Sequence, residues 1–120
     1  MPVSTAKISL IPNWATMPVE YRTVNCDNPF RKLCGGRFIV AMSGNAGFTH
    51  DPASVFEAAR VLKNNAAIRF LLSGEGVGWT KIKEMQAAAP LPNVTLIERV
   101  PGSELESFLS AGDLFSWGPL

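Results

Sequence analysis

The stretch from Phe38 to Asp51, FIVAMSGNAGFTHD, constrains the fold of this 120-residue chain more than any other. Its first five residues are apolar, and a run of this length suits a buried strand but is too short for a helix. The glycines at positions 44 and 47 permit a tight turn, and Asp51-Pro52 has the residues preferred at the cap and first position of a helix. A strand, a glycine loop and a helix N-terminus in this order leave backbone N–H groups directed outward. The stretch therefore predicts an anion or phosphate site at the carboxyl end of a strand.

The remainder of the chain repeats this alternation. Short apolar runs predict further strands at 68–73, 94–100 and 113–117, and apolar residues at helical spacing predict helices over 52–64 and 79–89. Strands that alternate with helices favour parallel pairing with right-handed crossovers. We expect an α/β fold, a Rossmann-like three-layer α/β/α sandwich with a partial parallel sheet of about four strands in the order 3-2-1-4. The strand ends at 44–47, 74–76 and 99–101 would then face one edge of the sheet.

For two of the predicted helices, the sequence also indicates which residues face the core. In the first, the apolar face is predicted to consist of Val55, Ala58, Ala59 and Leu62. The last helix is predicted to begin at Ser103, which forms a capping box with Glu106. Its inward residues would be Leu105, Phe108 and Leu109.

The segment 1–37 shows little periodicity and is predicted to be an irregular connector, with the domain proper over 38–120. Within this segment the run from Lys7 to Ile11, KISLI, could form a short strand. A helical turn is expected from Phe30 to Leu33, closed by Gly35-Gly36.

Composition excludes several functional classes. Hydrophobic residues make up 47% and charged residues 18%, as in a globular domain, and a net charge of +1 without a basic tract argues against nucleic-acid binding. No apolar run reaches the length of about 18 residues that a membrane span needs, and no signal-peptide pattern begins the chain, so a cytoplasmic location is expected. Cys26 and Cys34 indicate structural or incidental thiols in a reducing compartment, and no metal site is expected.

The glycine loop supports two interpretations. Gly44, Asn45, Ala46 and Gly47 could hold a diphosphate, or could form an ordinary turn between strand and helix. The loop matches neither a Walker motif nor the GxGxxG pattern of dinucleotide sites. Asp51 at the helix cap would repel an anion, which counts against the phosphate interpretation.

Three charged or titratable residues near the predicted edge also have alternatives. His50, which is the single histidine, could reach a ligand or could cap and pack locally. Glu75 could accept a hydrogen bond from a ligand hydroxyl or remain a solvated turn acid. Arg99 could pair with a phosphate, or with one of the nearby acids Glu98, Glu104 and Glu106. The residues themselves indicate no catalytic group.

Several segments in order resemble the donor-binding half of family 4 glycosyltransferases, which have the GT-B architecture. These segments are IPNW (11–14), NPFRK (28–32), FIVAMSGNAG followed by HD (38–51), RFLLSGEGVGW (69–79) and LPNVTLIERVPGSELESFLSAGDL (91–114). The similarity covers residues 8 to 115 and is closest to bacterial members that assemble polysaccharides.

The resemblance implies retaining sugar transfer from a nucleotide-sugar donor such as a UDP- or GDP-sugar, without a further cofactor. The glycine loop, Gly44 to Gly47, would lie against the donor diphosphate. Residues implied to line the cleft are His50, Gly74, Glu75 and Gly76, and those implied to border the base are Arg99, Val100 and Pro101.

The chain departs from the family pattern in three ways. The acceptor domain that would precede it is missing, and it ends at Leu120, before the two glutamates that the family places seven residues apart. Phe48 also stands where many relatives have a basic residue. We therefore expect a fragment that is inactive alone, that can self-associate through exposed apolar surface, and whose full-length protein could lie at the inner face of the membrane.

Two alternatives to this function remain. The first is a noncatalytic Rossmann-like nucleotide-binding or protein-interaction module. The second is an oxidoreductase-type dinucleotide domain, which is the weaker because Phe70-Leu71 stands where the ribose-binding acid is expected.

Overall fold

The structure is a computed structural model that describes residues 5–12, 27–45 and 53–115. It begins with a short 3-10 turn, η1 (Thr5–Lys7). The remaining elements in chain order are α1 (Pro29–Leu33), β1 (Phe38–Asn45), α2 (Ala53–Val61), β2 (Ile68–Glu75), α3 (Val77–Ala88), β3 (Val94–Glu98), α4 (Gly102–Ala111) and β4 (Leu114–Phe115).

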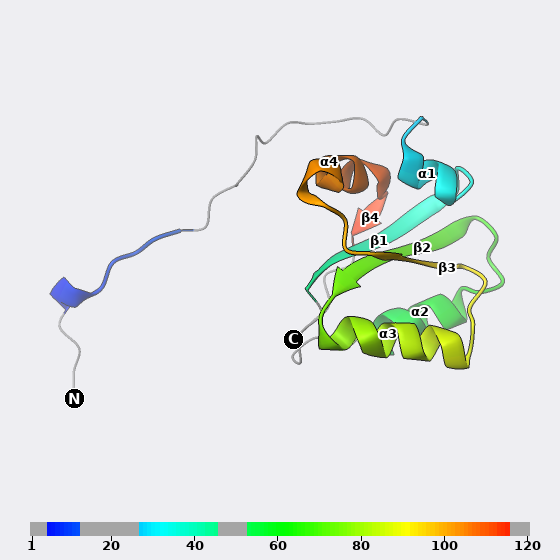
Figure 1. The fold of residues 1–120 in the computed structure, drawn as a ribbon, viewed down its shortest axis with the longest axis horizontal. Coiled ribbons are helices and arrows are strands. Elements are labelled where there is room, and N and C mark those ends of the chain that lie inside the picture. Colours follow the sequence, from blue (N-terminus) through cyan, green and yellow to red (C-terminus); the bar gives the residue numbers. More distant parts are fainter. Residues whose placement is uncertain (1–4, 13–26, 46–52, 116–120) are drawn as a thin grey trace.

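The four strands form one parallel sheet in the order β3-β2-β1-β4, which confirms the predicted fold class (Figure 1). Phe38 lies opposite Ile68 at the start of β1 and β2, and Gly44 lies opposite Gly74 near their ends. Gly74 is in turn opposite Glu98 at the end of β3. The chain builds the sheet outward from β1 to β3 and then returns to the other side of β1, so the strand order reverses between β1 and β4.

Helices α2 and α3 cover one face of the sheet (Figure 1). Because successive strand residues point to opposite faces, Phe70 and Leu72 of β2 both reach this side. They pack with Phe56 of α2 and with Trp79 and Ile82 of α3 in one buried cluster. The apolar run in β2 is thus explained by a strand that is covered on both sides.

Helices α1 and α4 cover the opposite face, which completes the three layers. Ile39 of β1 and Leu71 of β2 point to this side and pack with Phe108 of α4. Phe30 of α1 meets Phe108 edge to face, with ring centroids 5.3 Å apart. Cys34 is buried in the same cluster and burial raises the pKa of its thiol, as suits a structural cysteine.

The Arg31–Asp113 cluster fastens α1 to the start of β4. The Arg31 guanidinium donates to the Asp113 carboxylate at 2.7 Å, to the Ala111 carbonyl at 3.0 Å and to the Arg37 carbonyl at 3.3 Å. The same Asp113 oxygen accepts from the backbone N–H of Ile39 at 2.8 Å. One carboxylate therefore joins the helix α1, the strand β1 and the segment that leads into β4.

Asn28 makes a second connection between α1 and α4. Its Oδ1 accepts from the backbone N–H groups of Phe30 and Arg31, and so caps α1, while its Nδ2 donates to the Ser107 carbonyl at 2.7 Å. Phe30 and Cys34 also pack in the cluster on this face of the sheet, and both belong to the segment 1–37 that the sequence predicts to be a connector.

The structure differs from four local expectations. Ile8, Leu10 and Ile11 are exposed, and none of the four strands in the described region includes them, so the predicted strand KISLI is wrong. Helix α4 begins at Gly102 after Pro101, so Ser103 is inside the helix and the predicted capping box is wrong. Leu109 and Ala58 are exposed, because each lies on the outer side of its helix.

Candidate functional site

The carboxyl ends of three neighbouring strands meet at one edge of the sheet. The register places Gly44 beside Gly74, Asn45 beside Glu75, and Gly74 beside Glu98. The prediction that these strand ends share an edge is confirmed. In open α/β sheets, ligands bind outside the carboxyl ends of the strands, next to the point where the strand order reverses. Here that point lies at β1, the strand that carries Gly44.

The backbone requires glycine at two positions at the end of β2. A Cβ on Gly74 would lie 2.9 Å from the Gly44 carbonyl oxygen and 3.3 Å from a ring carbon of Trp79, which is closer than the packing allows. Gly76 has φ +93°, a conformation that L residues rarely adopt, and it precedes the first residue of α3. Gly74 lets β1, β2 and Trp79 of α3 lie in close contact, and Gly76 permits the turn from β2 into α3.

Glu75 and Arg99 form an ion pair across this edge. Nη1 of Arg99 lies 2.8 Å from Oε1 of Glu75, and the two side chains are 70% and 46% exposed. One of the two interpretations from the sequence paired Arg99 with Glu98, Glu104 or Glu106, but the structure pairs it with the acid at the end of the adjacent strand. The two residues are far apart in the chain, and the parallel register of β2 and β3 brings them together.

Glu98 has different partners at the same edge. Its carboxylate accepts from the indole N–H of Trp79 at 3.1 Å and from the Lys83 ammonium at 3.3 Å, and these two bonds lower its pKa. Its backbone carbonyl accepts from the buried Ser73 hydroxyl at 2.9 Å. Sequence reasoning treated Trp79 as a packing residue and did not single out Lys83. The spacing of Trp79 and Lys83, four residues apart on one helix, is the sequence feature that could have placed them together.

The remaining predicted residues are placed as follows. Val100 is buried in the cluster on the α1 and α4 side, so its side chain packs in the core while its backbone follows the end of β3. Pro101 is exposed and is the residue before α4. Asn45 is the last residue of β1. The predicted site residues Ala46, Gly47 and His50 lie outside the described residues, as do Phe48, Asp51, Cys26, Trp14 and Trp117.

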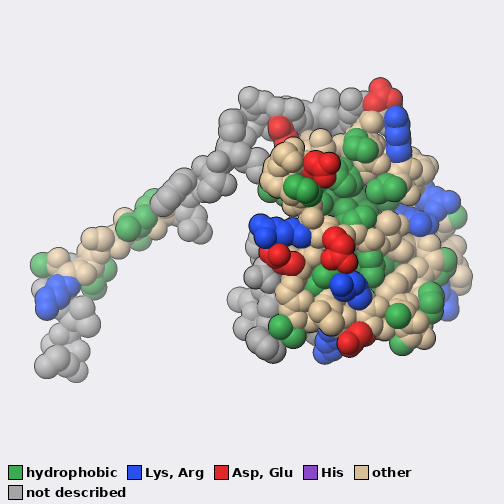
Figure 2. Space-filling view, viewed as in Figure 1, with side chains coloured by type: hydrophobic (Ala, Val, Ile, Leu, Met, Phe, Trp, Pro, Cys, Tyr) green, Lys and Arg blue, Asp and Glu red, His purple; other side chains and the backbone are tan. Residues whose placement is uncertain are grey.

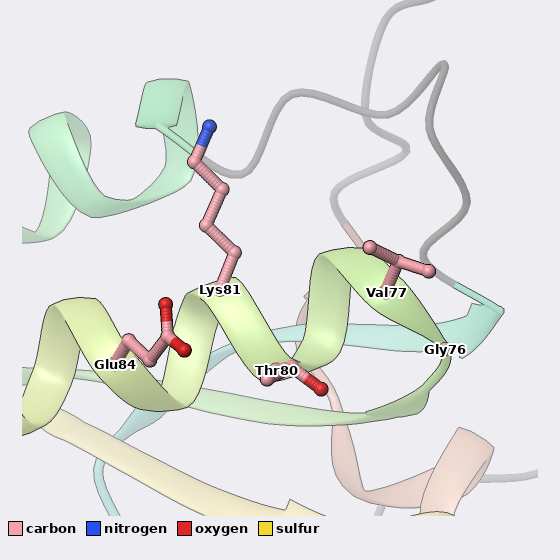
Figure 3. Close-up of a pocket in the computed structure, with 5 residues that line it drawn as sticks. All are labelled: Gly76, Val77, Thr80, Lys81 and Glu84. Atoms are coloured by element: carbon pink, nitrogen blue, oxygen red, sulfur yellow. The ribbon is translucent and has the colours of Figure 1, made fainter.

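A shallow hollow of about 740 Å³ runs along the first half of α3 (Figure 3). It is lined by Gly76, Val77, Thr80, Lys81 and Glu84. Gly76 belongs both to this hollow and to the predicted cleft, whereas Gly44 and Arg99 do not line it. The 77, 80, 81, 84 spacing places these side chains on one outer face of the helix, and sequence reasoning had not selected them.

In the view of Figure 2, acidic and basic side chains are interspersed, without a broad surface of one sign. Among the described residues, no group of three or more His, Cys, Asp or Glu side chains could hold a metal ion. None of the helices in the described ranges combines the length and apolar character that crossing a bilayer requires.

No protein-family profile and no curated protein sequence matches the chain. The resemblance to glycosyltransferases therefore stays a prediction from the sequence, and the fold and the edge geometry are the observations on which a function can be argued.

Proposed function

We propose that this chain forms the donor-binding half of a retaining glycosyltransferase and that its ligand is a nucleotide-sugar such as a UDP- or GDP-sugar. The observation that carries the proposal is the convergence of Gly44, Gly74 and Gly76 with the exposed guanidinium of Arg99 at the carboxyl edge of the sheet. This edge adjoins the reversal of strand order at β1, where open α/β sheets place their ligands.

Each part of the edge suits one part of such a ligand. Gly44, near the end of β1, has open space where a Cβ would stand, so a diphosphate can approach the backbone there without meeting a side chain. The guanidinium of Arg99 can donate two parallel hydrogen bonds to a phosphate, a geometry that lysine cannot supply. The backbone from Arg99 to Pro101 would border the base, as the resemblance implies.

Nucleotide titration followed by amide NMR tests this proposal. UDP or GDP should shift the resonances of Gly44, Gly74 to Gly76, and Arg99 to Val100. Resonances at the opposite edge, such as Ile68 and Val94 at the starts of their strands, serve as internal controls and should stay in place. A response to NAD alone, or shifts confined to the opposite edge, would overturn the proposal.

A noncatalytic interaction module is the second candidate, and exposed apolar residues at the edge strand favour it. Leu114 and Phe115 of β4 are 55% and 39% exposed, and an edge strand with apolar side chains is a common site of association. Sedimentation over a wide concentration range tests this role. A concentration-dependent dimer that leaves UDP and GDP unbound would favour the module, whereas a monomer at all concentrations would count against it.

A further inference from the structure

The Glu75–Arg99 ion pair joins two residues that the proposed function assigns to the same ligand site. Glu75 ends β2 and Arg99 follows β3, and their charged groups are 2.8 Å apart at the carboxyl edge. Among the described residues, Arg99 is the ion-pair partner of Glu75. The guanidinium that is available for a phosphate is thus already in contact with a carboxylate of this chain.

A phosphate that binds Arg99 would share the guanidinium with this carboxylate. Two anions close to one guanidinium repel each other, so the phosphate is bound well only when the Glu75 carboxylate moves away. Glu75 can do so at small cost, because the pair is exposed to water and its neighbours Gly74 and Gly76 have no side chains to restrain it.

Glu98, the other acid with which a strand of the described region ends, does not compete in the same way. Glu98 is held by Trp79 and Lys83, which lie on α3, and it points to the α2 and α3 side of the sheet. Its charge is therefore compensated by the protein in both the free and the bound state. Glu75 alone among these acids pairs with the guanidinium at the proposed phosphate position.

We propose that Glu75 is an internal competitor for the ligand phosphate at Arg99. In the free protein its carboxylate neutralises the guanidinium, and in the complex the phosphate replaces it. This inference rests on the proposed function and adds a determinant of selectivity to it. Glu75 weakens the binding of anionic ligands that use Arg99 and leaves the binding of an uncharged nucleoside unaffected.

The test is a set of titrations of the whole chain with UDP and with uridine, or with GDP and guanosine if GDP is bound more tightly. The proteins are the wild type, Glu75→Gln, Arg99→Gln and the double variant. Exposed ion pairs contribute at most a few-fold to an equilibrium constant, so Glu75→Gln should tighten UDP binding about two- to fivefold. Uridine binding should not change, and the gain should disappear when Arg99 is replaced as well.

Glu57→Gln is the matched control. It removes the same charge from another exposed arginine pair, Glu57–Arg60 on α2, and should leave the affinity for UDP unchanged. Amide spectra of all variants establish that the fold is intact, as the exposure of the substituted residues leads us to expect.

The outcomes separate the inference from the proposed function. If the wild type binds UDP and Glu75→Gln binds it equally or more weakly, Glu75 does not compete and the inference is overturned alone. A gain that persists in the Arg99→Gln background would show a general charge effect and would also overturn it. If neither the wild type nor Glu75→Gln binds UDP or GDP, the proposed function fails together with the inference.

Discussion

Two arginine–carboxylate pairs in this molecule have nearly the same length and opposite surroundings. Arg31 and Asp113 are 2.7 Å apart and their side chains are 14% and 23% exposed. Arg99 and Glu75 are 2.8 Å apart and are 70% and 46% exposed. The distance between the charges therefore does not distinguish a structural pair from one that is available to a ligand. Burial and further hydrogen bonds make that distinction.

The further bonds explain why the first pair is structural. Asp113 also accepts from the Ile39 N–H, and Arg31 also donates to the Ala111 and Arg37 carbonyls. Removal of either side chain would leave partly buried backbone groups without a partner, which is costly. Among the described residues, the pair at the edge of the sheet has one ionic contact, and its side chains are 70% and 46% exposed, so either partner can be released.

The largest effect is expected for Asp113→Ala, which would leave the Arg31 guanidinium and the Ile39 N–H without their carboxylate partner. We expect a loss of about 2–3 kcal/mol in the free energy of unfolding, measured by urea denaturation. Asp113→Asn keeps an acceptor for the Ile39 N–H and should lose less. A loss below about 0.5 kcal/mol for Asp113→Ala would remove the contrast between the two pairs.

A substitution of Gly74 tests the backbone packing of the candidate site without changing its charges. Gly74→Ala would place a methyl group 2.9 Å from the Gly44 carbonyl oxygen, so one of two hydrogen-bonded strands must shift. We expect a cost of about 1–3 kcal/mol in urea denaturation. The control is Gly102→Ala at the start of α4, where an added methyl group would meet no atom within 4 Å. That substitution needs no shift of the structure, so equal costs for the two variants would contradict a rigid edge.

Acid should weaken the Arg31–Asp113 cluster. Burial tends to raise the pKa of Asp113, but the bonds from the Ile39 N–H and the Arg31 guanidinium outweigh it, and the pKa is lowered. A lowered pKa in the folded state stabilises the protein above the unfolded value of about 4, and this contribution is lost as the pH falls through the folded value. The stability difference between the wild type and Asp113→Asn should therefore shrink as the pH falls below about 4. A difference that is constant from neutral pH into this range would refute the assignment.

The smallest effect is expected at the edge of the sheet. Glu75→Ala and Arg99→Ala should each change the free energy of unfolding by less than about 0.5 kcal/mol, since the pair is exposed. Thermal and urea denaturation measure this directly. A loss comparable with that of Asp113→Ala would assign the pair to stability and would weaken its proposed role in ligand binding.

The sheet could be predicted from the sequence because both faces of its central strands are covered. Such strands appear in the sequence as short, nearly continuous apolar runs. The run at 68–73 and the run at 38–42 became β2 and β1, and the intervening helix became α2. KISLI failed as a strand because strand propensity needs a neighbouring strand to pair with, and the described sheet offers it none. The error at Leu109 has a similar origin, since only the position of the sheet decides which side of α4 is buried.

The sequence alone determined the parallel α/β architecture and the edge at which three strand ends meet, because local periodicity and short crossovers leave few topologies open. The tertiary structure decided the partners of the charged residues. Arg31 and Asp113 are 82 positions apart, and Glu75 and Arg99 meet only through the register of β2 with β3. Side-chain pairing across strands and layers depends on distances that no local pattern contains, and for that reason Glu75 was not among the acids that the sequence offered as partners of Arg99.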